Sequence, residues 1–444
     1  MENPKNPITG VIKTDEVTYC FHLNDYCMLL LDNEVTHSYI NATLRPVDGF
    51  AQAMTHGGSK ILMHVGNLDF TVVNTMKINL SSYIVSTTNV LDYDISYFDG
   101  VEFIGGTLLN LKMPMGMKFD YDAETAKRYI EHIDDTQTFS FSTVDFGCKV
   151  TIGSSTSEHH GLTGATLTNG NIYFEMEFDK PQTTSKAYSH YNKVRELLSF
   201  LVNRCNVGFD EMYLLQKDEN HPGMMSRVAR VFIKKEKELT KKDIHHNLGF
   251  GMLGNSLGNL LRTLYIPEEH SLSIYPESDR SSTIITNDMV RGVCSALECE
   301  LNFVKGIGAS EAEKIERLVK SIKKIIKEHR KSEDKLKDKT YSLIHGSMSH
   351  WSLSASDRIK ALFHMYDTEM TILNESRFVI SDEEIDAFVK YRNEITHGTY
   401  RVLEPVIAYT THLLAGLVYC CVLTRIGIPR EKITEWCKER KLNN

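Results

Sequence analysis

The chain has 444 residues, enough for two or three domains that each bury a core. Its hydrophobic fraction of 41% and charged fraction of 24% are typical of a soluble globular protein. Nine cysteines, an odd number without a CxxC pair, argue against a disulfide framework and a zinc ribbon. No leader of the secretory type is recognisable, so we expect a cytoplasmic protein.

Charge is distributed unevenly along the chain. The net charge of −8 argues against a general nucleic-acid binder. Residues 1–180 hold 11 Lys and Arg against 23 Asp and Glu, whereas residues 181–444 hold 39 against 35. Any affinity for a polyanion is therefore expected in the second half.

Residues 1–180 are predicted to form a β-rich N-terminal domain. Short runs of β-branched and aromatic residues alternate with Gly, Asn and Asp clusters, which is typical of a sandwich or a rolled antiparallel sheet. One helix is expected at Ala123–Ile133, where acidic residues occupy the first turn. Strands are expected at Val17–Leu23, Ser38–Leu44, Lys60–Val65, Phe70–Asn74, Ser82–Thr88, Val101–Leu111, Phe139–Ile152 and Asn171–Phe178.

Residues 181–280 are predicted to form a mixed, helical linker region. A helix is expected at Thr183–Asn203, and short strands at Met212–Leu215 and Val228–Phe232. Gly249–Gly254 matches GxGxxG, but neither a preceding strand nor a parallel-sheet pattern surrounds it. The motif therefore does not predict a dinucleotide site, and its role stays open.

Residues 281–444 are predicted to form a helical bundle, which places the whole chain in the α+β class. Ser381, followed by three acidic residues, begins a helix that is expected to run to His397 and stop at Gly398. The most apolar segment, Val402–Ile428, follows it. Its longest apolar run is too short for a membrane span, so a buried helix is expected. Further helices are expected at Thr283–Lys305, Ser310–Lys331, Ser356–Met365 and Arg430–Lys441.

A basic stripe accompanies the helix at Ser310–Lys331. The window 305–339 holds 12 Lys and Arg against 7 acidic residues. Such a stripe is usually a solvated helix face, and it can also follow a phosphate backbone. The candidate RNA-contacting residues are Lys320, Lys323, Lys324 and Lys327.

Arg392 and His397 form the strongest candidate site. Two such residues at this spacing arise by chance in a chain of this size, and Arg358 and His364 form a second pair. Context separates the pairs, because Arg392 and His397 lie at the predicted end of a helix. Asn393 is placed on the same helix face as His397. Arg392 lies about 140° away from His397 around the helix. Its side chain is long enough to curl round the helix end, and a second copy of the chain could also bring its own pair alongside.

These residue types suit the cleavage of RNA. The reaction needs a base for the 2′-hydroxyl, an acid for the 5′-oxygen and a cation for the phosphate. Histidine exchanges protons near neutral pH, and arginine binds phosphate oxygens through its planar fork. The predicted chemistry requires neither a metal nor a cofactor, and the sequence shows no cluster of metal ligands.

The stretch Arg392-Asn393-Glu394-Ile395-Thr396-His397-Gly398 resembles the signature of HEPN ribonucleases. HEPN stands for higher eukaryote and prokaryote nucleotide-binding domain. The order of a β-rich domain, a linker and a helical bundle resembles the ApeA-like family of bacterial anti-phage proteins. This resemblance covers most of the chain, and only the HEPN signature is specific.

The resemblance implies a HEPN bundle that forms a homodimer or a higher oligomer around a shared catalytic site. It implies metal-independent cleavage of RNA, with transfer RNA a common target, to 2′,3′-cyclic phosphate ends during abortive infection. Arg392 would stabilise the phosphate and His397 would transfer protons. Asn393 would orient or bind substrate, and Glu298 or Glu300 would position Arg392. The N-terminal domain would sense an unknown phage-derived trigger or restrain the nuclease.

Two other interpretations stay open at this point. One is a non-catalytic HEPN module that binds RNA, a nucleotide or a protein next to a β-rich ligand-sensing domain. The other is a carbohydrate- or protein-binding β domain joined to a helical dimerisation module. Neither interpretation requires an association with membranes.

Overall fold

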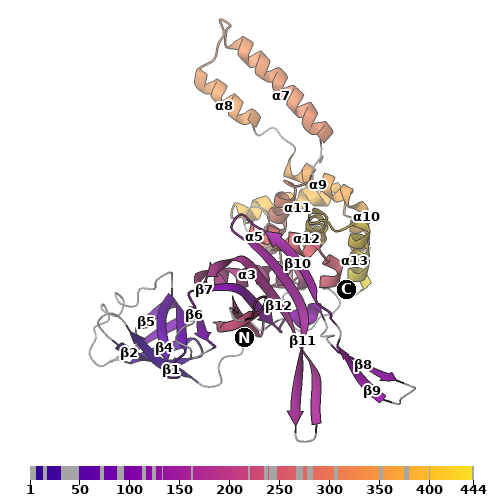
Figure 1. Cartoon of the computed structure of the whole chain (residues 1–444). Helices are drawn as coiled ribbons and strands as arrows, with labels where there is room; N and C mark the ends of the chain where they lie inside the picture. The colour runs from indigo at the N-terminus through magenta and orange to yellow at the C-terminus, as the bar shows by residue number, and fades with distance from the viewer. Residues whose placement is uncertain are drawn as a thin grey trace. The chain divides into compact units, whose positions relative to one another are not determined.

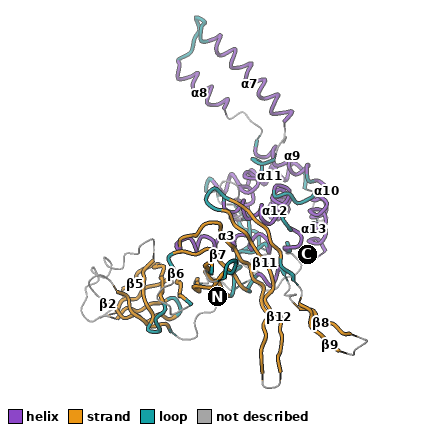
Figure 2. Tube along the Cα trace, in the orientation of Figure 1, coloured by secondary structure: helices purple, strands orange, loops and turns teal. Residues whose placement is uncertain are grey.

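The computed structural model describes residues 7–13, 18–31, 50–70, 75–87, 95–112, 117–122, 127–132, 134–161, 164–218, 221–234, 239, 248–266, 274–277, 284–304, 309–349, 354–374, 380–399 and 401–442. The chain divides into two compact units. One consists of Met1–Pro267 with Glu277–Asp279, and the other of Glu268–Pro276 with Arg280–Asn444. Strands dominate the first unit and helices the second, which confirms the predicted α+β class (Figures 1 and 2).

One antiparallel sheet organises the first unit. Its strands follow the order β10-β11-β12-β7-β13-β14-β6-β3-β2-β1-β4-β5 within the described residues, and β5 pairs again with β6. Strands β1 to β6 thereby close on themselves. The bounds are β1 Ile8–Lys13, β2 Thr18–Asn24, β3 Cys27–Leu31, β4 Phe50–Thr55, β5 Lys60–Phe70, β6 Thr75–Ser86, β7 Tyr97–Ile104, β10 Gln137–Ser142, β11 Gly147–Gly161, β12 Gly164–Thr183, β13 Glu211–Lys217 and β14 Met225–Ile233.

The sheet continues beyond residue 181, where the sequence suggests the first domain boundary. Strand β13 pairs with β7, and β14 pairs with β6. Helix α3 (Ala187–Val202) packs against α5 (Ser256–Tyr265) within the same unit. The structure therefore divides between residues 267 and 280, well beyond the end of the first predicted domain.

Alternation of side chains along the strands builds the core of the closed part of the sheet. In β2, Tyr19, Phe21 and Leu23 are buried, whereas their neighbours face outward. A second group of aromatic residues surrounds His190 of α3, whose Nδ1 lies 2.7 Å from the hydroxyl of Tyr265. Its rings come from Phe98, Phe146, Phe178 and Tyr265.

Three local predictions for this unit are wrong. The segment expected as a helix at Ala123–Ile133 contains β9 (Lys127–His132), which pairs with β8 (Met117–Asp122). Pairing with the preceding segment overrides the local helix signal. The expected strand Val101–Leu111 ends at Ile104 and continues into the short helix α2 (Leu108–Leu111). The segment Phe139–Ile152 is two strands joined by a turn.

Other predicted segments are placed differently or lie outside the description. The expected strand Ser38–Leu44 falls outside the described residues, as do residues 71–74 of another. Gly249 and Gly254 flank the four-residue helix α4 (Phe250–Leu253), which is followed by α5. The GxGxxG pattern thus lies at a helix–helix junction, which is not the strand–turn–helix setting of a dinucleotide site.

The second unit is a helical bundle with α12 (Pro405–Arg425) at its centre. This helix is apolar enough to span a membrane, with a mean hydropathy of 1.8, yet 78% of that stretch is buried in the protein. It contacts α6, α10, α11 and α13, as expected for the core helix of a bundle. The bounds are α6 Asn287–Glu300, α9 Ala355–Met365, α10 Asp367–Leu373, α11 Asp382–Thr396 and α13 Arg430–Leu442.

Two ion pairs tie the bundle helices together. The carboxylate of Glu300 on α6 accepts two hydrogen bonds from Arg425 of α12, at 3.0 and 2.8 Å. Glu369 of α10 is fully buried and accepts two from Arg430 of α13, at 3.0 and 2.9 Å. Both pairs are bidentate, the geometry that best offsets the cost of burying a carboxylate.

Helices α7 (Ala309–His329) and α8 (Asp338–Ser349) form a hairpin (Figure 1). Its small core consists of Ile326, Tyr341 and Met348, with Ile322 and Ile344 half-buried beside them. The predicted helix Ser310–Lys331 is therefore confirmed.

Candidate active site

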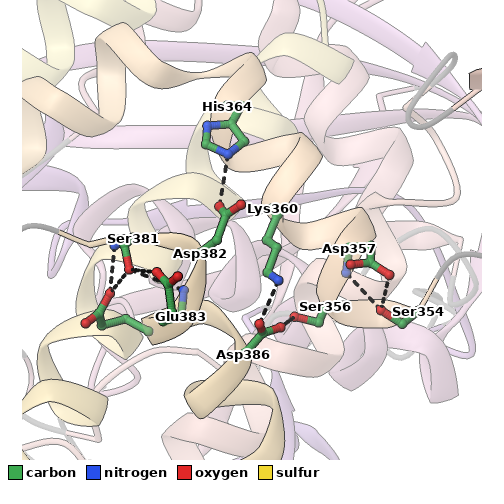
Figure 3. Close-up of polar contacts among 10 residues, drawn as sticks. Ser354, Ser356, Asp357, Lys360, His364, Ser381, Asp382, Glu383 and Asp386 are labelled. Carbon is green, nitrogen blue, oxygen red and sulfur yellow. Dashed lines mark hydrogen bonds and ion pairs between the residues drawn. The ribbon is translucent and has the colours of Figure 1, made fainter. Parts of the chain in front are cut away.

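The helix that carries the motif, α11, begins as the sequence predicts. Ser381 caps it, and the carboxylate of Glu384 accepts a hydrogen bond from the Ser381 backbone N–H at 2.8 Å, completing a capping box. One turn later, Asp386 accepts hydrogen bonds from Ser356 and from Lys360 of α9 (Figure 3). These contacts fix the first turns of α11 against α9.

The competing pair, Arg358 and His364, is occupied in structural contacts. His364 lies with Nε2 3.0 Å from a carboxylate oxygen of Asp382, at the start of α11 (Figure 3). Arg358 donates to the carbonyl of Leu301 at 3.0 Å. Their side chains join helices of the bundle, which agrees with the interpretation of this pair as structural.

The other end of α11 closes in a Schellman motif. The Thr399 N–H donates to the carbonyl of Glu394 at 3.0 Å, and the Gly398 N–H to that of Ile395 at 3.4 Å. Gly398 has φ +84°, a left-handed conformation that a glycine adopts without strain. The helix therefore ends at Thr396 with His397 as its C-cap, within one residue of the predicted end, and the His397 side chain is exposed at the terminus.

Arg392 is held in place by two acceptors. Its Nη2 donates to Oε2 of Glu298 on α6 at 3.1 Å, and its Nη1 donates to Oδ1 of Asn393 at 3.1 Å. The Arg392 side chain is 24% exposed, so most of it is covered by the protein. A guanidinium carries more N–H donors than these two contacts use, and the fork can also bind a phosphate.

The structure distinguishes the two candidate positioning residues. Glu298 contacts Arg392, whereas Glu300, two residues further along α6, is buried and paired with Arg425. Residues two apart on a helix point to different sides. Glu298 therefore faces the candidate site and Glu300 faces the core.

Asn393 contacts Arg392 more directly than the sequence suggests. Its backbone carbonyl accepts the N–H of His397 at 3.1 Å, which is the expected four-residue step. Its side-chain oxygen, however, accepts from Arg392. Asn393 thus orients Arg392 through its side-chain oxygen. The Asn393 side chain is exposed, and its amide nitrogen is a further hydrogen-bond donor beside the arginine.

A second arginine at this helix end was not predicted. Arg291 of α6 donates from Nη2 to the carbonyl of Ile395 at 2.7 Å and from Nη1 to Asp288 at 2.7 Å. A cation is favourable at the C-terminal end of a helix, where carbonyls without a helical partner gather. The sequence signal that could have predicted Arg291 is its spacing from Glu298. The two residues are seven positions apart and therefore lie on one face of α6.

The loop after the motif is tied back to the bundle. The hydroxyl of Tyr391 donates to Oδ1 of Asn287 at 2.9 Å and to the carbonyl of Arg401 at 3.3 Å. Glu394 and Arg401 form an ion pair at 2.8 Å. Contacts to α6 and to the following loop therefore bracket Arg392 and His397.

Cys294, next to Glu298, is not poised as a nucleophile. Burial, assisted by the negative charge of Glu298, raises the pKa of the Cys294 thiol to about 11. A protonated, buried thiol is unreactive at neutral pH. In the described part of the chain, no group of three or more His, Cys, Asp or Glu side chains is arranged to hold a metal ion.

The four candidate lysines lie away from these contacts, on α7. Lys320, Lys323, Lys324 and Lys327 are exposed, and Lys320 forms an ion pair with Glu316 at 2.8 Å. Among the described residues, no hydrogen bond or ion pair joins any of these lysines to Arg392 or His397.

Comparison with known proteins supports the assignment of the bundle. Residues 300–432 match the family model described as Apea-like HEPN. The matched segment contains Arg392, Asn393 and His397, and Glu298 lies two residues before its start. The resemblance predicted from the motif is confirmed for this C-terminal region. No curated protein and no solved structure matches the chain.

Proposed function

We propose that the chain is an endoribonuclease that cleaves RNA without a metal and leaves 2′,3′-cyclic phosphate ends. The family match supports a ribonuclease or defence-related function in general terms. The observation that carries the specific proposal is the orientation of Arg392 by Glu298 and Asn393, together with the exposure of His397 at the end of the same helix.

Each residue has a distinct part in the proposed reaction. Arg392 binds the scissile phosphate and stabilises the charge that builds on its oxygens. His397 transfers a proton to or from the 2′-hydroxyl or the leaving 5′-oxygen. Glu298 and Asn393 are positioning residues, because they act through the arginine.

The site is proposed to be complete only in a pair of chains. Arg392 and His397 project about 140° apart around one helix, so they do not point at the same atom. A second copy that brings its α11 alongside supplies a second arginine and histidine. Base and acid then come from different chains, and a homodimer is the working unit.

The biological setting of the proposal follows the family. We place the enzyme in the cytoplasm, in an abortive-infection response with transfer RNA as a candidate substrate. Residues 1–180, which belong to the first unit, carry a net charge of −12, and this charge repels RNA and suits a sensing or restraining role.

The proposal is tested by RNA cleavage with purified protein. Arg392→Ala and His397→Ala are each expected to lose at least about 100-fold in rate, because each removes a group that acts on the transition state. The matched control is the double variant Arg358→Ala/His364→Ala, whose residues show the same pattern but structural contacts. Cleavage at the parental rate by either motif variant would refute the assignment. RNA binding without turnover by the parent, across RNA classes, would favour a binding module.

A further inference from the structure

The candidate site lies at the end of α11 that repels anions. Arg392 and His397 belong to the last turn of this helix and its C-cap, where the final carbonyls form the negative pole of the helix dipole. Anions bind at the opposite end of a helix, where the N–H groups point outward. A phosphate backbone that approaches His397 is therefore repelled by these carbonyls unless a positive charge offsets them.

Arg291 places a positive charge against this helix end. Its Nη2 donates to the carbonyl of Ile395, and its Nη1 donates to a carboxylate oxygen of Asp288, both at 2.7 Å. The Arg291 side chain is 42% exposed, and a guanidinium has five N–H donors, so these two contacts leave donors for a ligand. The contact with Ile395 holds the guanidinium at the same helix end as His397.

Three ion pairs surround this helix end in the described part of the chain, and each joins one arginine to one carboxylate. They are Arg291–Asp288, Arg392–Glu298 and Arg401–Glu394. The carboxylates differ in exposure, because the side chain of Asp288 is 89% exposed, that of Glu298 40% and that of Glu394 27%. A carboxylate that lies in water loses little when its partner leaves, since solvent replaces the ion pair. Arg291 is therefore the arginine that can turn from its carboxylate to a phosphate with the smallest loss.

The spacing along α6 assigns Arg291 and Arg392 to different phosphates. Glu298, which holds Arg392, lies seven residues after Arg291, or about 10 Å along the helix. In a nucleic-acid helix the phosphates of one strand recur about every 3.4 Å of rise. A strand whose scissile phosphate is bound by Arg392 therefore has a further phosphate within the distance that separates the two arginine sites.

We propose that Arg291 binds a second backbone phosphate of the RNA, beside the scissile one, through the Nη1 that otherwise donates to Asp288. Nη2 remains on the carbonyl of Ile395, so one side chain both offsets the negative helix end and binds the strand. The inference rests on the proposed ribonuclease function. It makes the substrate a strand with at least one phosphate next to the cleaved linkage.

Neutral linkages in the substrate test this contact. The probe is a short single-stranded DNA with one central ribonucleotide, so only one linkage has the 2′-hydroxyl that cleavage needs. In two further probes, a methylphosphonate removes the charge of the neighbouring phosphate on the 5′ side or on the 3′ side. For the parent, one of these changes should raise KM about fivefold and leave kcat unchanged, because a flanking phosphate binds equally in the ground state and the transition state.

The same probes are cleaved with Arg291→Ala. This variant should raise KM for the fully charged probe about fivefold, and the methylphosphonate should then have no further effect. Arg317→Ala, which removes another exposed arginine from an ion pair, is the matched control and should respond like the parent. If Arg291 only stabilised the helix end, its loss would lower kcat with every probe and leave the response to the methylphosphonate intact. Equal responses of the parent and Arg291→Ala at both linkages would overturn the proposal.

Binding measurements separate this inference from the proposed function. The dissociation constants are determined with probes that carry a 2′-deoxynucleotide at the centre, so cleavage is not required. Binding that depends on Arg291 and on the flanking phosphate, without cleavage of the ribonucleotide probe, would support the contact and contradict the ribonuclease. Cleavage by the parent and Arg291→Ala with equal KM would contradict the contact alone. An absence of binding to every probe would overturn the contact as well.

Discussion

Replacing Glu298 by Gln tests whether the orientation of Arg392 contributes to catalysis. The substitution keeps the size of the side chain and an oxygen that can accept from Arg392, but it removes the charge. Two unit charges 3.1 Å apart, the distance between Nη2 of Arg392 and Oε2 of Glu298, attract by about 5 kcal/mol at an effective dielectric constant of about 20. Most of this energy is offset by solvent, because the Glu298 side chain is 40% exposed and that of Arg392 is 24% exposed.

The net contribution of the pair is therefore about 1 kcal/mol. The free energy of unfolding should fall by no more than this amount. If the same energy holds the guanidinium in the direction that the transition state needs, kcat should fall about fivefold while KM for RNA changes little. If Glu298 had a purely structural role, Glu298→Gln would lower the free energy of unfolding without this selective decrease in kcat.

The assay is steady-state RNA cleavage by Glu298→Gln, Arg392→Ala and the variant with both changes. Because Glu298 acts through Arg392, the double variant should cleave no more slowly than Arg392→Ala alone. Glu313→Gln, which removes an exposed ion pair with Arg317 on α7, is the matched control and should keep the parental kcat. Parental kcat in Glu298→Gln, or additive losses in the double variant, would refute the positioning role.

Three further outcomes concern stability and the end of the motif helix. Burial lowers the pKa of His190 to about 3, below its ordinary value of 6.5. As the pH falls, His190 is therefore protonated in the unfolded chain before it is protonated in the folded one. The free energy of unfolding should fall by about 2 kcal/mol between pH 7 and pH 5 for this reason. Burial alone would raise the pKa of Glu369, but the hydrogen bonds from Arg430 hold this pKa below its ordinary value. The ionised carboxylate therefore stabilises the fold above the ordinary pKa, and this contribution is lost in acid. Replacing Glu369 by Gln should lower the free energy of unfolding in urea at pH 7 by about 3 kcal/mol. Gly398→Ala should cost about 1 kcal/mol through its positive φ and lower the rate of RNA cleavage.

Each of these outcomes has its own comparison. In His190→Phe, the free energy of unfolding should change less between pH 7 and pH 5 than in the parent. An unchanged pH dependence would exclude His190 as its source. Glu431→Gln, an exposed residue of α13, should unfold like the parent beside Glu369→Gln. Gly251→Ala, at a glycine with ordinary φ and open space, should not lose stability as Gly398→Ala does. Similar losses in the two glycine variants would argue against backbone strain at Gly398.

Elements with local signals were predicted well. The helix at α11 follows from its serine cap, its acidic first turn and the glycine behind it, and α12 follows from its apolar composition. Pairings between strands distant in the sequence were not. The strands expected at Met212–Leu215 and Val228–Phe232 are present as β13 and β14. Their pairing with β7 and β6, more than a hundred residues earlier in the chain, is encoded by no local pattern.

The residues of the candidate site were likewise predicted where the signal is local and missed where it depends on distant contacts. The positions of Arg392 and His397 came from a short motif at a helix end. The choice between Glu298 and Glu300 required the rotation of α6, which its burial against α12 determines. Arg291 was missed because its partner is a backbone carbonyl on another helix, and a carbonyl has no sequence signature.

The three tethers between α6 and the end of α11 bear on how two copies would meet. Asn287, Arg291 and Glu298 each hold a different residue near the motif, so that terminus is already ordered within one chain. Little conformational entropy then remains to be lost when a second copy arrives. Under the two-chain proposal, a weak and reversible encounter would suffice to assemble a competent centre. At protein concentrations below the dissociation constant of the dimer, activity would then rise with the square of the protein concentration. The expression level would therefore control whether the enzyme is active.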